Sequence, residues 1–220
     1  MRWLRLIKND PPIPRTKPIL KEYNALIRGS EKRTADYPID DLFLDRWSPR
    51  AMTGEQVSNE DLMSLFEAAR WAPSSYNNQP WRMLYAHRDT DAWPLFFNLL
   101  VEFNQGWAKN AGVLVLFISK TTMDMNGEPS ITHSFDTGSA WENFALQGWL
   151  QGLVVHGMQG FDYDRARIEL EIPEGYAVEA MIAVGKPADT DSLSEALRGR
   201  EAPSNRRPLE QTICEGKFCL

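Results

Sequence analysis

The sequence predicts an α+β fold, in which helices pack over a single sheet. Two apolar runs rich in β-branched residues, at 113–119 and 178–184, are typical of strands buried on both faces. Residues 136–153 are apolar on nearly every side of a helix, so they predict a long, buried helix. Because helices and strands mix without a strict βαβ rhythm, the pattern favours an α+β arrangement.

We assign the first forty residues to an N-terminal arm and residues 41–220 to one compact domain. Four prolines within residues 11–18 indicate extended chain, and residues 20–28 have the composition of a short helix. The first eight residues mix basic and apolar side chains without a signal-peptide core. We expect a terminal or docking arm there, with a weak membrane-surface contact as the alternative.

The remaining elements follow from capping signals and periodicity. Ser58 and Asp61 have the spacing of a capping box, which predicts a helix that begins there and ends before Pro73. Its predicted buried face consists of Leu62, Leu65, Phe66 and Ala69. Three further elements are predicted: a strand at 82–86 and helices at 93–103 and 162–170.

Small residues along the long predicted helix indicate a close approach by another backbone. They are Gly138, Ala140, Gly148 and Gly152. We therefore expect the core to continue across the interface of a homodimer.

The composition is that of an ordinary globular protein. The net charge of −6 disfavours nucleic acid as a partner, although nine of the 24 basic residues fall in the first forty. The two cysteines, Cys214 and Cys219, do not make a disulfide framework, so a reducing cytosol and a cytoplasmic location are the default expectation. No apolar run reaches the roughly 18 residues of a transmembrane helix.

Several common chemistries have no motif in this sequence. There is no G-x-G-x-x-G fingerprint, no P-loop, no G-x-S-x-G elbow, no C-x-x-C and no H-E-x-x-H. The three histidines, His87, His133 and His156, are scattered, so we expect no metal site.

Three polar clusters lie where a fold alone does not need them. Arg46, Ser48 and Arg50 bring two guanidiniums and a hydroxyl within five residues, and guanidiniums match phosphate oxygens with a planar set of donors. Residues 73–81 carry amides and hydroxyls that can read the carbonyls and nitrogens of a flavin ring. Residues 204–208 form the third cluster. Ordinary turns and a solvated charged tail are the alternative explanations.

Together these clusters resemble the motifs of the nitroreductase family. Residues 73–81 match its P-S-S-x-N-x-Q-P-W segment at every fixed position. Residues 46–50 resemble its R-x-S-x-R/K phosphate motif, and residues 157–162 resemble its late G-F-D turn. Arg206 with Pro208 matches the arginine that returns to the phosphate.

The resemblance spans about residues 45–213 and implies a nitroreductase-like fold, with a central, mostly antiparallel sheet flanked by helices, in an interlocked homodimer. It also implies FMN as cofactor and NADH or NADPH as electron donor. The residues implied to hold the phosphate and ribityl end are Arg46, Ser48, Arg50 and Arg206. Those implied to reach the flavin from the partner subunit are Ser74, Ser75 and Asn77. The resemblance also implies that Gln159 and Gly160 present backbone N–H groups near flavin N5, and that Asn104 reaches the ring.

The chain departs from the family pattern at three positions. Trp107 stands where several members carry a lysine near the flavin, Gly157 replaces a proline, and Gln159 replaces a glutamate. These changes bear on the redox potential and the substrate range. The aromatic residues proposed as walls of the substrate pocket are Tyr76, Trp107, Phe135 and Trp141. For each of them, core packing is the alternative.

The implied chemistry belongs to the flavin, so no catalytic acid or nucleophile is assigned to the protein. A nicotinamide gives a hydride to N5, and a small electron-poor acceptor, such as a nitroaromatic or a quinone, then receives the electrons in the same slot. Two alternatives stay open. One is a flavin enzyme of this fold that performs dehalogenation or dehydrogenation, with residues 121–135 as a lid. The other is a non-enzymatic flavin-binding sensor or scaffold that uses the N-terminal arm.

Overall fold

The computed structural model describes residues 27–219. The predicted extended stretch at residues 11–18 and the alternative of a membrane-surface contact by the first eight residues lie outside the described residues. Of the predicted helix at residues 20–28, only Ile27 and Arg28 are described, and neither is helical.

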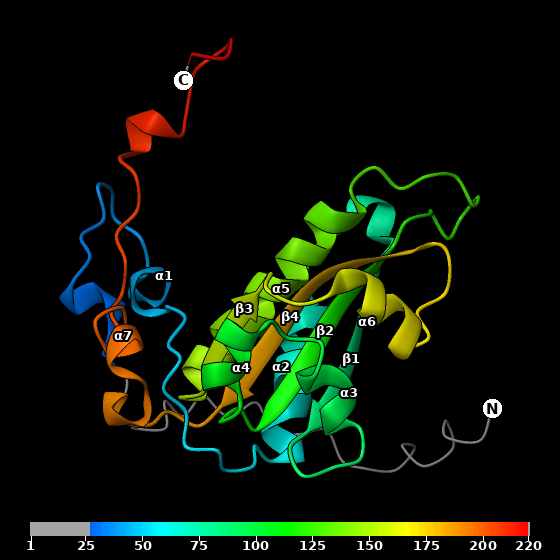
Figure 1. Ribbon diagram of the computed structural model, residues 1–220. Coiled ribbons are helices and arrows are strands. Elements are labelled where there is room, and N and C mark those ends of the chain that lie inside the picture. The colour runs from blue at the N-terminus through cyan, green and yellow to red at the C-terminus, as the bar shows by residue number, and fades with distance from the viewer. Residues whose placement is uncertain (1–26, 220) are drawn as a thin grey trace, which may run out of the picture.

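A four-stranded antiparallel sheet lies at the centre of the described chain, in the order β1-β2-β4-β3 (Figure 1). The strands are β1 (Trp81–His87), β2 (Val113–Lys120), β3 (Val154–Met158) and β4 (Tyr176–Gly185). β1, β2 and β4 confirm the three predicted strands. β3 was not predicted, because His156 and Gly157 interrupt its apolar character within only five residues.

Alternate side chains of β2 enter two separate cores, one on each face of the sheet. Val113, Val115 and Phe117 pack with helices α2 (Asn59–Arg70) and α5 (His133–Leu150). On the other face, Leu114, Leu116 and Ile118 pack with α3 (Trp93–Phe97), α4 (Glu102–Ala108) and α6 (Tyr163–Glu169). The α+β prediction and the prediction that this strand is buried on both faces are confirmed.

Short elements complete the described chain. They are the helices α1 (Asp41–Asp45) and α7 (Glu195–Arg198), and the 3₁₀ turns Gly29–Glu31, Ser75–Asn77, Thr190–Ser192 and Leu209–Gln211.

Helix α2 begins at the predicted capping box. The Ser58 hydroxyl accepts a hydrogen bond from the Asp61 backbone N–H at 3.0 Å and donates to the Asp61 carboxylate at 2.8 Å. The helix ends at Arg70, before Pro73. Leu62, Leu65 and Ala69 are fully buried, as the periodicity predicts.

The predicted helix at residues 93–103 is instead two helices, α3 and α4, separated at Leu100. The Val101 N–H donates to the Gly160 carbonyl at 3.1 Å, and the Asp162 N–H donates to the Leu99 carbonyl at 2.8 Å. Because this stretch of backbone pairs with the turn after β3, it cannot continue a helical hydrogen-bond pattern. The break therefore joins the start of α4 to that turn.

The first described segment and the chain around Ser204 lie side by side at one end of the molecule (Figure 1). Beyond them the C-terminal tail projects away from the sheet, and its last residues include the exposed Ile213 and Phe218. Cys214 and Cys219 form a disulfide in this tail, which the expectation of a reducing cytosol did not include. Since the bridge closes only a short exposed loop, the two cores do not depend on it.

The small residues of α5 serve different purposes. A Cβ on Gly148 would lie 2.3 Å from Val155 Cγ2, so this glycine lets α5 pack closely on β3 within one chain. A Cβ on Gly138 would meet nothing within 4 Å among the described residues. The homodimer that these small residues suggested therefore stays a prediction, and Gly148 is explained without it.

We predict opposite effects for alanine at these two glycines. Gly148→Ala should lower the free energy of unfolding by about 1–3 kcal/mol, because the added methyl collides with the stiff Val155 side chain. Gly138→Ala should raise it by about 0.5–1 kcal/mol, because alanine restricts the unfolded chain and favours the helix. Urea unfolding of both variants checks this, and equal changes would contradict the assignment of Gly148 to internal packing.

Candidate functional site

An arginine-rich cavity of about 330 Å³ lies where distant parts of the chain meet. Its walls come from residues 46–50 after α1, from His156 in β3 and from residues 200–206 near the C-terminus. All four predicted phosphate-binding residues line it: Arg46, Ser48, Arg50 and Arg206. Arg33 and Arg200 also line it, although neither was predicted to belong to a site.

Residues 46–50 reach this cavity because α1 ends at Asp45 and the backbone then becomes extended, with φ −65° and ψ 127° at Arg46. Arg46 Nη1 donates to Ser48 Oγ at 3.4 Å, and Arg46 Nε lies 3.7 Å from the Glu142 carboxylate. A guanidinium beside a hydroxyl offers several donors to one oxyanion. The pair therefore suits a phosphate group.

Glu201, which was not predicted as a site residue, anchors the other side of this segment. Its carboxylate is buried and accepts hydrogen bonds from the backbone N–H groups of Arg50 and Ala51, the second at 2.8 Å. Its second oxygen lies 3.7 Å from Arg50 Nη1. Arg50 Nε is buried and has no hydrogen-bond acceptor among the described residues. A buried guanidinium nitrogen without an acceptor is compatible with an anion bound in this cavity.

His156 lies in the cavity wall as a neutral ring. Its Nδ1 is 2.8 Å from the Pro49 carbonyl, and the ring centroid is 4.6 Å from that of Trp107. Burial, with the added effect of the positive charges of Arg50 and Arg46, lowers the pKa of His156 to about 4. At neutral pH Nδ1–H therefore donates to Pro49, and Nε2 is left as an acceptor.

The turn at residues 73–81 does not line the arginine cavity. Its backbone is strained, because Tyr76, Asn77 and Gln79 have φ values of 51°, 53° and 46°. The buried carboxylate of Asp136 accepts a hydrogen bond from the Ser75 N–H at 3.1 Å and holds the turn to α5. The structure thus separates the predicted residues Ser74, Ser75 and Asn77 from the arginine cluster within one chain.

Asn104 is used inside the protein. Its Nδ2 donates to the Gly160 carbonyl at 3.0 Å, and its Oδ1 accepts from Trp107 Nε1 at 3.2 Å. A Cβ on Gly160 would lie 2.6 Å from Asn104 Nδ2, so a larger residue would displace the Asn104 side chain from its present position. Asn104 therefore fixes the turn that carries Gln159 and Gly160.

The structure corrects one of the four predicted pocket walls. Trp107 is 1% exposed and lies in the core on the α4 side of the sheet, because its ring packs on His156 and its Nε1 is bonded to Asn104. It cannot contact a ligand without disrupting that core. Trp141 is partly buried under Gly157, whose Cβ would lie 3.1 Å from the indole. Tyr76 and Phe135 are strongly exposed.

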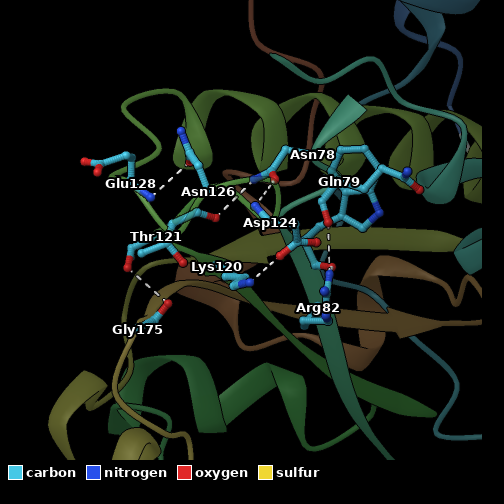
Figure 2. A network of polar contacts seen from close by, with 11 residues as sticks. Asn78, Gln79, Arg82, Lys120, Thr121, Asp124, Asn126, Glu128 and Gly175 are labelled. Atoms are coloured by element: carbon cyan, nitrogen blue, oxygen red, sulfur yellow. Dashed lines mark hydrogen bonds and ion pairs between the residues drawn. The ribbon is translucent and has the colours of Figure 1, made fainter. Parts of the chain in front are cut away.

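The loop after β2 is docked on the strained turn (Figure 2). The buried Asn78 donates from Nδ2 to the Thr122 carbonyl at 3.2 Å and accepts from the Asp124 N–H at 2.8 Å. Its side-chain amide thus bonds one carbonyl and one N–H group of the loop backbone. Lys120 forms an ion pair with Asp124. Between the loop and the turn lies a second cavity of about 310 Å³, lined by Tyr76, Asn77, Asn78, Gln79, Arg82, Met123, Asp124 and Met125.

Residues 27–219 contain neither a helix suited to cross a membrane nor a cluster of side chains suited to bind a metal ion. No helix in this part of the chain has the length and hydropathy needed to cross a bilayer. No group of three or more His, Cys, Asp or Glu side chains is placed there to hold a metal ion.

Comparisons with known proteins place these motifs in a family. The family described as Nitroreductase family matches residues 44–101. A solved structure of an oxidoreductase containing FMN is 47% identical, with a TM-score of 0.83, over 88% of this chain and 99% of that chain. This chain belongs to the nitroreductase family.

Two other relatives are less similar in sequence. A protein named NADH dehydrogenase from Thermus thermophilus is 27% identical over 77% of this chain and 92% of its own length. A putative nitroreductase from Desulfovibrio desulfuricans, solved in complex with FMN, is 26% identical with a TM-score of 0.63, over 84% of this chain and 100% of that chain. The nitroreductase match begins at residue 44, so Arg33 lies outside it.

We predict that Glu201 stabilises the fold mainly as a hydrogen-bond acceptor. Glu201→Ala leaves the backbone N–H groups of Arg50 and Ala51 without their acceptor and should lower the free energy of unfolding by roughly 2–4 kcal/mol. Glu201→Gln keeps an oxygen of similar position and should lose less than half as much. Urea unfolding measures both, and equal losses would contradict the acceptor role.

We also predict a pH dependence that comes from His156. Between pH 6.5 and about 4 the unfolded chain binds a proton at this residue and the folded chain does not. Its contribution to stability is therefore complete above pH 6.5 and is lost as the pH falls toward 4, by roughly 3 kcal/mol in total.

The test compares unfolding free energies at pH 7 and pH 4.5 for the parent and for His156→Gln. Other groups titrate in both proteins, so the difference between the two pH dependences isolates His156. The variant should lose less stability on acidification. An identical loss in both proteins would show that His156 is not buried in its neutral form.

Proposed function

We propose that this nitroreductase is an FMN-dependent oxidoreductase that passes electrons from NADH or NADPH through bound flavin to small electron-poor acceptors such as nitroaromatics and quinones. The observation that carries the proposal is the arginine cavity. Arg46, Arg50 and Arg206 come from opposite ends of the domain and face one space. Glu142 and Glu201 offset only part of this positive charge, so the cavity favours an anionic ligand. The phosphate of FMN has the required charge and oxygen geometry.

The phosphate end would be held as the family motif implies. Arg46 and Ser48 would donate to the phosphate together, and Arg50 Nε would gain an acceptor that it lacks among the described residues. Arg206 would close the site from the C-terminal segment. His156 is neutral at pH 7, so the positive charge that attracts the anion would come from the arginines alone.

The ring end would lie at the turn after β3. The backbone of Gln159 and Gly160 would offer N–H groups near N5, and Asn104 would keep this turn in place through the Gly160 carbonyl. Bound flavin would supply the chemistry there, by accepting a hydride at N5 and delivering electrons to the acceptor. The protein's contribution is to bind and orient the reactants and to exclude water.

The third group of predicted contacts supports a homodimer as part of the proposal. Ser74, Ser75 and Asn77 do not line the arginine cavity of their own chain. We infer that they reach the flavin of the partner subunit, as the family resemblance implies. The exposed Tyr76 and Phe135, with Trp141, would then form walls for the acceptor. We propose a cytoplasmic location, where reduction of the Cys214–Cys219 bridge would leave the cores intact.

The decisive prediction concerns flavin reduction. Protein purified with FMN should show flavin absorption bands, and NADH or NADPH should bleach them under anaerobic conditions. Addition of a nitroaromatic or a quinone should then restore the bands. A bound flavin that neither nucleotide bleaches would refute the reductase assignment.

The cofactor site is tested separately in the same assay. The triple variant Arg46→Ala, Ser48→Ala and Arg206→Ala should bind FMN at least roughly a hundredfold more weakly, because it loses two charge-assisted contacts and a hydroxyl. Circular dichroism confirms that the variant is folded. A folded variant that retains FMN as tightly as the parent would contradict the proposed phosphate site.

A further inference from the structure

Arg33 is a buried cation that no motif of the family accounts for. It lies in the N-terminal segment, before the region that matches the family at residues 44–101. Only 9% of its surface is exposed, and it lines the arginine cavity beside Arg46 and Arg206. Residues 1–40 were predicted to form a separate arm, so a role for this segment in the cavity was not expected.

The guanidinium of Arg33 joins three segments through backbone carbonyls. Its Nε donates to Ser204 at 2.8 Å, and its Nη1 donates to Leu44 at 2.8 Å and to Arg46 at 2.9 Å. Arg46 belongs to the phosphate motif, and Ser204 precedes Arg206 by two residues. Arg33 therefore fixes the backbone on both sides of the proposed phosphate position.

The N-terminal segment is seated closely enough to hold Arg33 in place. A Cβ on Gly29 would lie 1.8 Å from the Leu44 carbonyl oxygen, so only glycine allows this approach. The Ser30 backbone N–H donates to the Asp45 carboxylate at 3.1 Å, and Trp47 Nε1 donates to the Ile27 carbonyl at 2.8 Å. The segment is thus tied to both ends of the turn that carries Arg46.

Among the described residues, the charge of Arg33 is balanced by backbone carbonyls and not by a carboxylate. No carboxylate of residues 27–219 forms a salt bridge with it, whereas Arg46 is paired with Glu142 and Arg50 with Glu201. Burial, and the nearby charges of Arg206 and Arg46, lower the pKa of Arg33. A guanidinium nevertheless stays charged in proteins, so the cavity holds an excess of positive charge.

We infer that Arg33 is a positioning residue of the phosphate site, which holds Arg46 and Arg206 in place and adds the positive charge that selects phosphate-bearing flavin over uncharged riboflavin. This inference rests on the proposed FMN function. If Arg33 has this role, the N-terminal segment that carries it contributes to cofactor binding.

The experiment measures the affinity of the full chain for FMN and for riboflavin, by quenching of flavin fluorescence. The ratio of the two affinities reports on the phosphate alone, because the ring and ribityl chain are common to both ligands. Arg33→Gln removes the charge and leaves a single amide nitrogen as donor, and it should lower the ratio by at least roughly tenfold. Arg33→Lys keeps the charge but cannot bond the carbonyls on both sides, and it should lower the ratio several-fold.

The matched control is Arg28→Gln, which removes the same charge from an exposed position of the same segment and should leave the ratio at the parental value. If Arg33→Gln does not fold, Arg33→Lys decides. A parental ratio in a folded Arg33 variant, or an equal loss of affinity for both flavins, would overturn the inference. A parent that does not prefer FMN to riboflavin would instead refute the proposed phosphate site itself.

Discussion

Electrostatic repulsion among the guanidinium groups that line the arginine cavity is the constraint on which this part of the structure depends. Like charges that lie close together repel one another, so each needs a compensating partner. The fold provides carbonyl oxygens for Arg33 and carboxylates for Arg46 and Arg50. These partners bring residues from opposite ends of the chain into contact, and they leave net positive charge for an anionic ligand.

The sheet determines where this cavity lies relative to the other functional elements. Because β2 is buried on both faces, α2 and α5 cover one side, and α3, α4 and α6 cover the other. β3 is at the edge of the sheet and contributes His156 to the cavity, and the turn that follows β3 carries Gln159 and Gly160. The strand thus connects the proposed phosphate end of the site to the proposed ring end.

Local signals in the sequence predicted the features that depend on neighbouring residues. The capping box at Ser58 and the buried strand at β2 follow from residue type and spacing alone, and both are confirmed. The break at Leu100 was missed because it is caused by pairing with the remote turn at Gly160. The resemblance to the nitroreductase family implied that Arg46 and Arg206 share one site, and both line the arginine cavity. The resemblance could not identify Arg33 or Glu201, whose partners are 171 and 151 residues away in the chain.

The strained turn and the first residues of α5 share one carboxylate. Asp136 Oδ2 accepts from the Ser75 N–H and from the Thr132 hydroxyl, each at 3.1 Å, and the exposed Phe135 is its neighbour on α5. Tyr76, with its left-handed backbone, follows Ser75 directly. Because the carboxylate of Asp136 bonds both segments, a displacement of the N-terminal turn of α5 would change the positions of the Tyr76 and Phe135 rings together. The affinity for any ligand that contacts both rings would therefore depend on the position of α5, which packs in the core at its other end.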